Sequence, residues 1–196
     1  MRSYAFFYVV PTSASEALVE YTLFSERLLE LRQYEDALRS YTGDVLKVND
    51  YEILDEEFGI IPMTNYLFPA GQGKHIVNIG SAGGSSKPSS GYTFLRIQKH
   101  VQKIVRAPEA GKSPVINANS AIRYRFYDSV LLNILKNHGE MSEEIFSEMV
   151  KNNMICQVFK FLDEEGGLKN DLKIITSVPP WLFSGSIVDL LVNRKL

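Results

Sequence analysis

The first part of the chain alternates apolar runs with polar turns. Residues 4–10 form an unbroken apolar run, which predicts a strand that is buried on both faces. A proline ends the run, and residues 16–24 then alternate in the manner of a second strand. One face of that strand sets Glu20 between Leu18 and Thr22. Residues 4–24 together therefore predict a hairpin.

A helix is expected next, over residues 26–42, because apolar side chains recur there at spacings of three and four. Ser25 is placed to cap its start and Gly43 to end it. Residues 51–60 are then predicted to form another strand. Residues 75–79 form a further short apolar strand that leads into a glycine-rich turn.

The remainder of the chain is predicted to be mainly helical. A helix over residues 91–106 follows the glycine turn, and residues 107–120 form a loop rich in proline, glycine and asparagine. Apolar periodicity then predicts five helices. The last three cover residues 154–162, 168–175 and 181–192.

The net charge and the cysteine content argue against some classes of function. The chain has 196 residues and a net charge of −2, which gives no electrostatic support for a nucleic-acid partner. Cys156 is the only cysteine, so neither an intrachain disulfide nor a cysteine metal cage is possible. The residue itself is expected to be buried in an apolar helix. No signal peptide or membrane-spanning segment is predicted.

The glycine-rich turn at residues 80–84 is a candidate anion site. A strand, a glycine turn and a helix in succession expose free N–H groups that can bind phosphate or another anion. The pattern alone is not specific, because it is neither Gly-x-Gly-x-x-Gly nor a Walker motif. A turn that merely packs a helix against a sheet remains the alternative.

Glu20 is the candidate acid. A carboxyl group in an apolar cleft has its ionised form disfavoured by desolvation, so it can stay protonated and donate a proton. The alternative is an ordinary solvent-facing glutamate. The acidic run at residues 55–57 is expected to be solvated, and no histidine lies near it to complete a metal site. None of the three histidines, His75, His100 and His138, shows ligand spacing.

Several segments together resemble the lycopene β-cyclases. Residues 7–13 and 17–22 are similar to the family's strand pair, whose second strand carries Leu-Val-Glu-Asp-Thr or Phe-Leu-Glu-Glu-Thr. Residues 59–63 resemble its Ile-Pro-Met segment, and residues 79–93 resemble its second flavin-binding motif. Residues 125–132 look like the helix that follows.

The resemblance implies a fold and a division of the chain. It predicts an α+β chain that is the C-terminal portion of a two-domain FAD-dependent flavoprotein, Rossmann-like and related to glutathione reductase and hydroxybenzoate hydroxylase. Residues 1–70 would belong to a substrate-binding sheet domain, 71–106 to the second flavin-binding unit, and 107–196 to a helical region. The relatives' N-terminal Gly-x-Gly-x-x-Gly motif is absent, so we expect a missing FAD-binding half and an inactive isolated chain.

The resemblance also assigns roles to residues. Glu20 matches the proposed acid, whereas Tyr21 stands where relatives have a second acidic residue, so a role that needs two acids is in doubt. Substrate contacts are expected from Leu18, Thr22, Pro62 and Met63. The residues expected to bind reduced FAD are Gly80, Ser81, Gly83, Gly84, Pro88, Ser89, Gly91 and Tyr92.

The implied reaction is a redox-neutral cyclisation of lycopene, or a related linear carotenoid, to β-ionone rings, with NAD(P)H reducing the flavin. Because lycopene resides in the bilayer, the protein is expected to be cytoplasmic and peripheral on the inner membrane. The last helix could dock on the membrane or pack on the core. The docking side chains would be Trp181, Leu182, Phe183, Ile187 and Leu191.

Three other interpretations remain open at the level of sequence. The chain could belong to a related FAD-dependent hydroxylase or geranylgeranyl reductase, which needs no acid at position 20. It could be an inactive fragment that binds an apolar ligand. It could also be a protein-interaction module whose partner supplies the missing sheet.

Overall fold

The computed structural model describes residues 4–118 and 120–192, and the chain divides into two compact units. The first extends to Gly59 and includes His138–Glu140, and the second contains Ile60–Asn137 and the chain from Met141 onward. Helices with two small sheets make up the described residues, which confirms an α+β chain in that general form. The three-part division drawn from the sequence stays a prediction.

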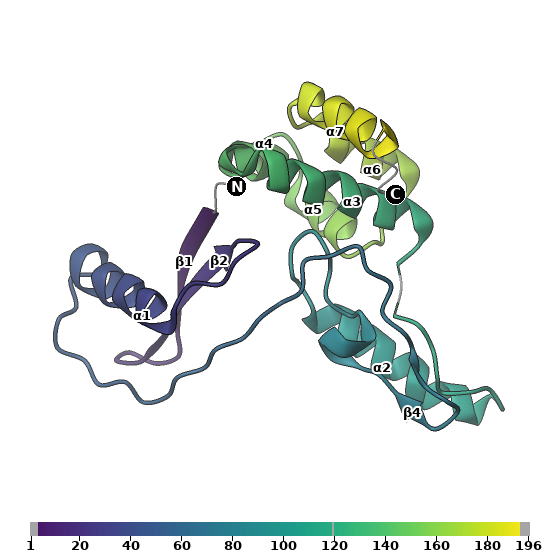
Figure 1. Cartoon of the computed structure of the whole chain (residues 1–196), viewed down its shortest axis with the longest axis horizontal. Coiled ribbons are helices and arrows are strands. Elements are labelled where there is room, and N and C mark those ends of the chain that lie inside the picture. Colours follow the sequence, from purple (N-terminus) through teal and green to yellow (C-terminus); the bar gives the residue numbers. More distant parts are fainter. Residues whose placement is uncertain (1–3, 119, 193–196) are drawn as a thin grey trace. The chain divides into compact units, whose positions relative to one another are not determined.

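The first unit contains the predicted hairpin. Strands β1 (Tyr4–Pro11) and β2 (Ala17–Phe24) pair antiparallel (Figure 1). In their register Tyr8 lies opposite Glu20. The expectation that β1 is buried on both faces is wrong, because no residue from 5 to 59 is buried. Among the described residues β1 has only β2 as a partner, and a two-stranded sheet cannot enclose its own strands.

Helix α1 (Leu31–Ser40) covers one face of this hairpin. The ring of Phe7 on β1 lies 4.2 Å, centroid to centroid, from that of Tyr41 and stacks on Tyr21 of β2. Tyr34 of α1 adds a contact of 5.8 Å with Tyr21. This face of the hairpin is therefore structural.

The start of α1 corrects the sequence prediction. Glu30, not Ser25, is the N-cap residue, because Glu30 and Gln33 form a reciprocal capping box. The predicted stop at Gly43 instead lies inside a π-helical turn over Tyr41–Val45 that continues the helix. The strand predicted at residues 51–60 is also wrong: that segment is irregular and pairs with no described strand.

The second unit begins with the segment that leads to the glycine turn. Strands β3 (Gly71–Gln72) and β4 (Ile76–Val77) form a short ladder, so the predicted strand at 75–79 is present only in part. A 3₁₀ turn over Gly80–Gly83 follows. Helix α2 (Phe94–Glu109) begins three residues later than the predicted 91 and extends into the predicted loop.

The helices after α2 pack around a shared core. They are α3 (Ile122–Asn137), α4 (Ser142–Lys151), α5 (Ile155–Leu162), α6 (Leu168–Thr176) and α7 (Pro180–Val192). Helices α3 and α7 run alongside each other (Figure 1). Ile134, Val158 and Ile174 lie fully buried between the helices. The predicted bounds of the last three helices agree with these to within one residue.

One single residue, Cys156, contradicts the sequence prediction, whereas His100 does not. Cys156 is exposed, not buried, because the buried position of α5 is Val158 and the thiol lies on another face. His100 of α2 is buried and structural, since its Nε2 lies 2.7 Å from the carbonyl oxygen of Ile116.

Candidate functional site

The backbone of the glycine turn permits only glycine at two positions. A Cβ atom at residue 83 would lie 2.3 Å from the carbonyl oxygen of Asn78, closer than atoms can approach. Gly84 has a left-handed φ of 73°, and a Cβ there would press against the Phe68 ring at 3.2 Å. The turn is thus held tightly against the preceding segment.

A cavity of about 750 Å³ opens beside this turn, within the second unit. One wall is the segment of residues 62–68, and the others come from the glycine turn, α2 and α3. Its lining residues are Pro62, Thr64, Asn65, Tyr66, Leu67, Phe68, Ser81, Gly84, Ser86, Pro88, Arg96, Ser120, Ile122, Arg125, Phe126 and Ser129. The lining is mixed: aromatic and aliphatic side chains alternate with hydroxyl groups and two guanidinium groups. Its size is within the range of small-molecule sites.

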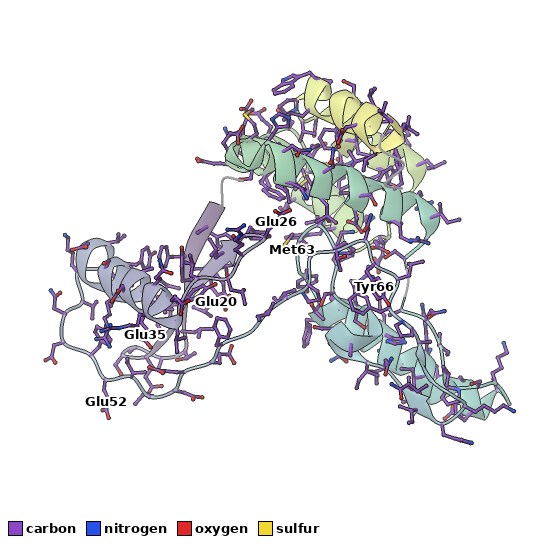
Figure 2. All side chains as sticks on the ribbon, viewed as in Figure 1. Glu20, Glu26, Glu35, Glu52, Met63 and Tyr66 are labelled. Carbon is purple, nitrogen blue, oxygen red and sulfur yellow. The ribbon has the colours of Figure 1, made fainter. Side chains whose placement is uncertain are left out.

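The structure brings part of the predicted site to this cavity. Ser81, Gly84 and Pro88, predicted to bind the cofactor, line it together with Pro62, which was predicted to bind substrate. Among the predicted site residues of this unit, those that do not line it are Gly80, Gly83, Ser89, Gly91, Tyr92 and Met63. Figure 2 shows Met63 and Tyr66 on the segment that precedes the turn.

The other predicted cofactor residues serve the loop itself. The Gly91 backbone has φ 73°, and a Cβ there would lie 3.2 Å from Ile61. The carbonyl oxygen of Tyr92 accepts a hydrogen bond of 2.9 Å from the backbone N–H of Lys87, which closes the loop. The Ser89 hydroxyl is buried and donates to Asp128 at 2.5 Å.

A largely buried charge network borders the cavity, and its members Arg96 and Ser120 belong to the lining. The Lys87 ammonium group is 2.9 Å from a carboxylate oxygen of Asp128 on α3 and 3.3 Å from one of Glu164 after α5. The Arg96 guanidinium of α2 lies 2.5 Å from the same Glu164 oxygen, which also accepts a bond from Ser120 at 2.7 Å. Two cations thus balance two carboxylates and join the turn to three helical segments.

The pKa of Asp128 is shifted in opposite directions by burial and by its partners in this network. Its side chain is almost fully buried, and its second oxygen, Oδ2, has no hydrogen-bond partner among the described residues. Burial raises the pKa of Asp128, although the charge of Lys87 and the bond from Ser89 act to lower it. Burial is the largest of these effects.

Glu20 lies on the hairpin, in the first unit (Figure 2). Its Oε1 accepts a hydrogen bond of 2.8 Å from the Thr22 hydroxyl, two residues along the same strand. Its Oε2 accepts a hydrogen bond from the phenol of Tyr8, the residue directly opposite on β1. Both partners are hydroxyls, which can donate or accept, so they can hold this carboxyl group with or without its proton.

Tyr8 is adapted to this contact. The pKa of Tyr8 is raised to about 12, mainly by its hydrogen bond to Glu20. Burial and nearby carboxylates contribute smaller effects in the same direction. The phenol therefore keeps its proton at neutral pH.

The face of the hairpin that carries Glu20 is apolar and open. The rings of Tyr8 and Phe24 both lie near that of Phe6, at centroid distances of 6.4 and 5.9 Å. Phe6 is 46% exposed and Leu18 43% exposed. The predicted substrate residues Leu18 and Thr22 thus accompany the predicted acid on one strand.

Sequence reasoning missed several of these residues. Tyr8 could have been found, because a hairpin turn centred at residue 14 places it opposite Glu20. Arg96, Arg125 and the pair Lys87–Asp128 gave no local signal, since their contacts join segments far apart in the sequence. Among the described residues no group of acidic, histidine or cysteine side chains could hold a metal ion.

Comparison with known protein families identifies the chain. A family model described as lycopene cyclase protein matches residues 1–181. The chain belongs to the lycopene cyclase family. No significant similarity to a curated protein or to a solved structure was found.

Membership of the lycopene cyclase family confirms the resemblance and assigns the chain to carotenoid cyclisation. A carotenoid is accordingly the class of substrate, and the family is generally flavin-dependent. The match extends over both structural units, so the Glu20 hairpin and the glycine-turn cavity are both parts of the family domain.

Proposed function

We propose that this chain is the C-terminal part of an FAD-dependent lycopene cyclase in which Glu20 is the proton donor. The observation that carries this proposal is the setting of Glu20: a carboxyl group held by two hydroxyls on an open aromatic face. A hydrocarbon substrate needs an apolar surface, and its cyclisation needs one acid.

Glu20 begins the proposed reaction by giving its proton to a terminal double bond of lycopene, which leaves a tertiary carbocation. A neighbouring double bond attacks that cation and closes a six-membered ring. Loss of a ring proton, which returns to the Glu20 carboxylate or passes to water, then produces the β-ionone end. The proton given up is thereby balanced, and no electrons are gained or lost overall. Tyr8 and Thr22 hold the carboxyl group during both protonation states, and the aromatic faces of Phe6 and Phe24 favour nearby positive charge.

The glycine-turn cavity suits a flavin ring. Gly84 leaves room beside Phe68 that any side chain would fill, and serine hydroxyls alternate with apolar walls. Ser81, Gly84 and Pro88 are the residues proposed to hold the ring. Reduced flavin, regenerated by NAD(P)H, would supply an electron-rich group that stabilises developing positive charge. A Gly-x-Gly-x-x-Gly segment from the proposed second half would bind its adenosine diphosphate.

Contact with the membrane is proposed for α7, with a revised set of side chains. Leu182 is fully buried, and Phe183 and Ile187 pack against the core, so these three do not face lipid. The side chains of Trp181, Val188 and Leu191 are each more than half exposed on the same helix. No single helix among the described residues is long and apolar enough to cross a membrane, although α6 and α7, bent by 110°, pass the criteria of length and composition as a pair.

The test of the acid is made on the chain joined to a family Gly-x-Gly-x-x-Gly half in a host that accumulates lycopene. Glu20→Gln should abolish cyclic carotenoid while the bound flavin, measured by its absorbance, stays unchanged. Tyr8→Phe should reduce the product without abolishing it, because Thr22 remains. Glu16→Gln, on the exposed turn of the hairpin, is the matched control and should retain full product. An active Glu20→Gln enzyme would exclude Glu20 as the acid.

The family match favours a cyclase over the related hydroxylases and reductases, whose redox chemistry needs no acid on this strand. A non-catalytic carotenoid binder would give a different result in the same experiment. It would retain the carotenoid without cyclising it, with or without Glu20.

A further inference from the structure

Arg125 on α3 is a cation on the cavity wall. It is half-buried and lines the cavity, yet it forms no ion pair or side-chain hydrogen bond with any described residue. A guanidinium group keeps its charge at any physiological pH, so it remains positive there. Burying part of a charged side chain costs solvation free energy, and a bound anion would offset that cost.

The carboxylates close to this wall are not available to Arg125. Asp128, one turn further along α3, is engaged by Lys87 and Ser89. Glu164 is engaged by Lys87 and Arg96. That network is neutral by itself, so Arg125 gives the cavity an excess of positive charge. The described residues that line the cavity include no aspartate or glutamate.

The other residues that line the cavity indicate which kind of ligand would fit it. Tyr66, Phe68 and Phe126 supply flat aromatic surface, and Pro62 and Pro88 supply rigid apolar surface. Arginine is suited both to paired hydrogen bonds with a planar anion and to stacking on a conjugated ring. A cavity with aromatic walls, in which Arg96 is neutralised by Glu164 and Arg125 has no ion pair with a described residue, therefore favours a conjugated molecule that carries a negative group.

We propose that this cavity is a binding site for a conjugated ligand with an anionic group, and that Arg125 binds that group. In the enzyme proposed above, the ligand is the flavin, and this identification rests on the proposed function. The negative group is then either the pyrimidine edge of the reduced ring or a flavin phosphate. The role of Arg125 as an anion receptor does not depend on that choice.

The first test uses the full chain and ligands unrelated to flavin. Binding of 8-anilinonaphthalene-1-sulfonate, an aromatic anion, is compared by fluorescence with binding of the uncharged N-phenyl-1-naphthylamine. Arg125→Met should weaken binding of the anion at this site about tenfold and leave the neutral probe within twofold. Arg125→Lys should retain part of the affinity. Arg106→Met, which removes an exposed arginine from α2, should change neither.

Equal effects of Arg125→Met on both probes, or no effect on either, would overturn the proposal. Loss of folding is monitored by circular dichroism, and little is expected because the Arg125 side chain pairs with none of the described residues. If Arg125→Met does unfold, Arg125→Lys is compared with Arg125→Gln instead. The lysine variant keeps the positive charge, so it should bind the anion more strongly than the glutamine variant.

The second test identifies the source of the anion with riboflavin and flavin mononucleotide, each oxidised and reduced. If Arg125→Met weakens only reduced riboflavin, Arg125 faces the ring; if it weakens only the mononucleotide, Arg125 faces the phosphate. If neither flavin binds the wild-type chain while the naphthalene sulfonate still depends on Arg125, the anion site stands and the flavin assignment of this cavity fails.

Discussion

The hairpin unit and the helical unit treat their carboxyl groups in opposite ways. Glu20 on the hairpin is half-buried, on an open aromatic face, and is held by hydroxyls alone. Asp128 and Glu164 in the helical unit are enclosed and held by Lys87 and Arg96. A group that must give a proton to a substrate needs access and partners that tolerate both charge states. Of these three carboxyl groups, Glu20 alone has both properties.

The two units also differ in what stabilises them. No residue from 5 to 59 is buried, whereas the helical unit buries a contiguous set of aliphatic side chains. A two-stranded sheet with one helix on it is marginal by itself, and the uncovered face of the hairpin is left for a ligand or further protein. The proposed acid therefore lies in the unit whose packing is weaker, whereas the unit with the buried aliphatic core carries the enclosed ion pairs.

The largest effect is expected from Lys87→Met, which leaves Asp128 and Glu164 enclosed with fewer cations. Removing one partner of a buried ion pair costs about 3–5 kcal/mol of unfolding free energy. Urea unfolding followed by helical circular dichroism measures it. The control is Lys99→Met, which removes an exposed ion pair of 2.6 Å with Glu165 from the same region. We expect almost no change there, because solvent screens that pair. If both variants lowered the unfolding free energy equally, burial would not explain the contribution of the Lys87 ion pairs to stability.

A second prediction contrasts the two units directly. Ile174→Ala removes a fully buried side chain from the helical core and should lower the unfolding free energy by about 2–5 kcal/mol. Phe6→Ser, on the open face of the hairpin, should change the unfolding of the helical unit by less than about 0.5 kcal/mol. If Phe6→Ser destabilised the helices as much as Ile174→Ala, the two units would unfold as one and the contrast would fail.

Sequence reasoning predicted the parts of this molecule that depend on local pattern. The helices at 154–162, 168–175 and 181–192 were found because apolar spacing and nearby glycine or proline residues mark them. The hairpin was found because its alternation is local. The prediction of a strand at residues 51–60 was wrong. A strand forms only when a neighbouring strand pairs with it, and the sequence of a segment does not show whether such a neighbour is present.

Residues of the candidate site could be predicted only where they belong to short, continuous segments of the sequence. Glu20, Thr22 and the turn residues Ser81, Gly84 and Pro88 belong to short segments that can be recognised by themselves. Arg125, and the contact between Lys87 and Asp128, depend on how α3 packs near the turn, which no spacing in the sequence encodes. Contacts of that kind appear only after folding.

The smallest effect expected is a pH dependence contributed by Asp128. Burial raises the folded-state pKa of Asp128 above its ordinary value of 3.8. The folded chain then holds this proton more tightly than the unfolded chain, so the contribution of Asp128 to stability is largest in acid. That contribution is lost as pH rises through the folded pKa, by at most about 1.4 kcal/mol for each unit of pH.

Asp128→Asn removes this titration and nearly preserves the shape of the side chain. The unfolding free energy of the wild-type chain minus that of the variant should therefore fall as pH rises from about 4 upward, as measured by urea unfolding at each pH. An increase in that difference with pH would mean that Lys87 and Ser89 dominate over burial, so that the ionised form of Asp128 stabilises the fold. Asp163 lies one residue before Glu164 and forms no ion pair with any described residue. Asp163→Asn should therefore leave the wild-type profile unchanged if the effect belongs to Asp128.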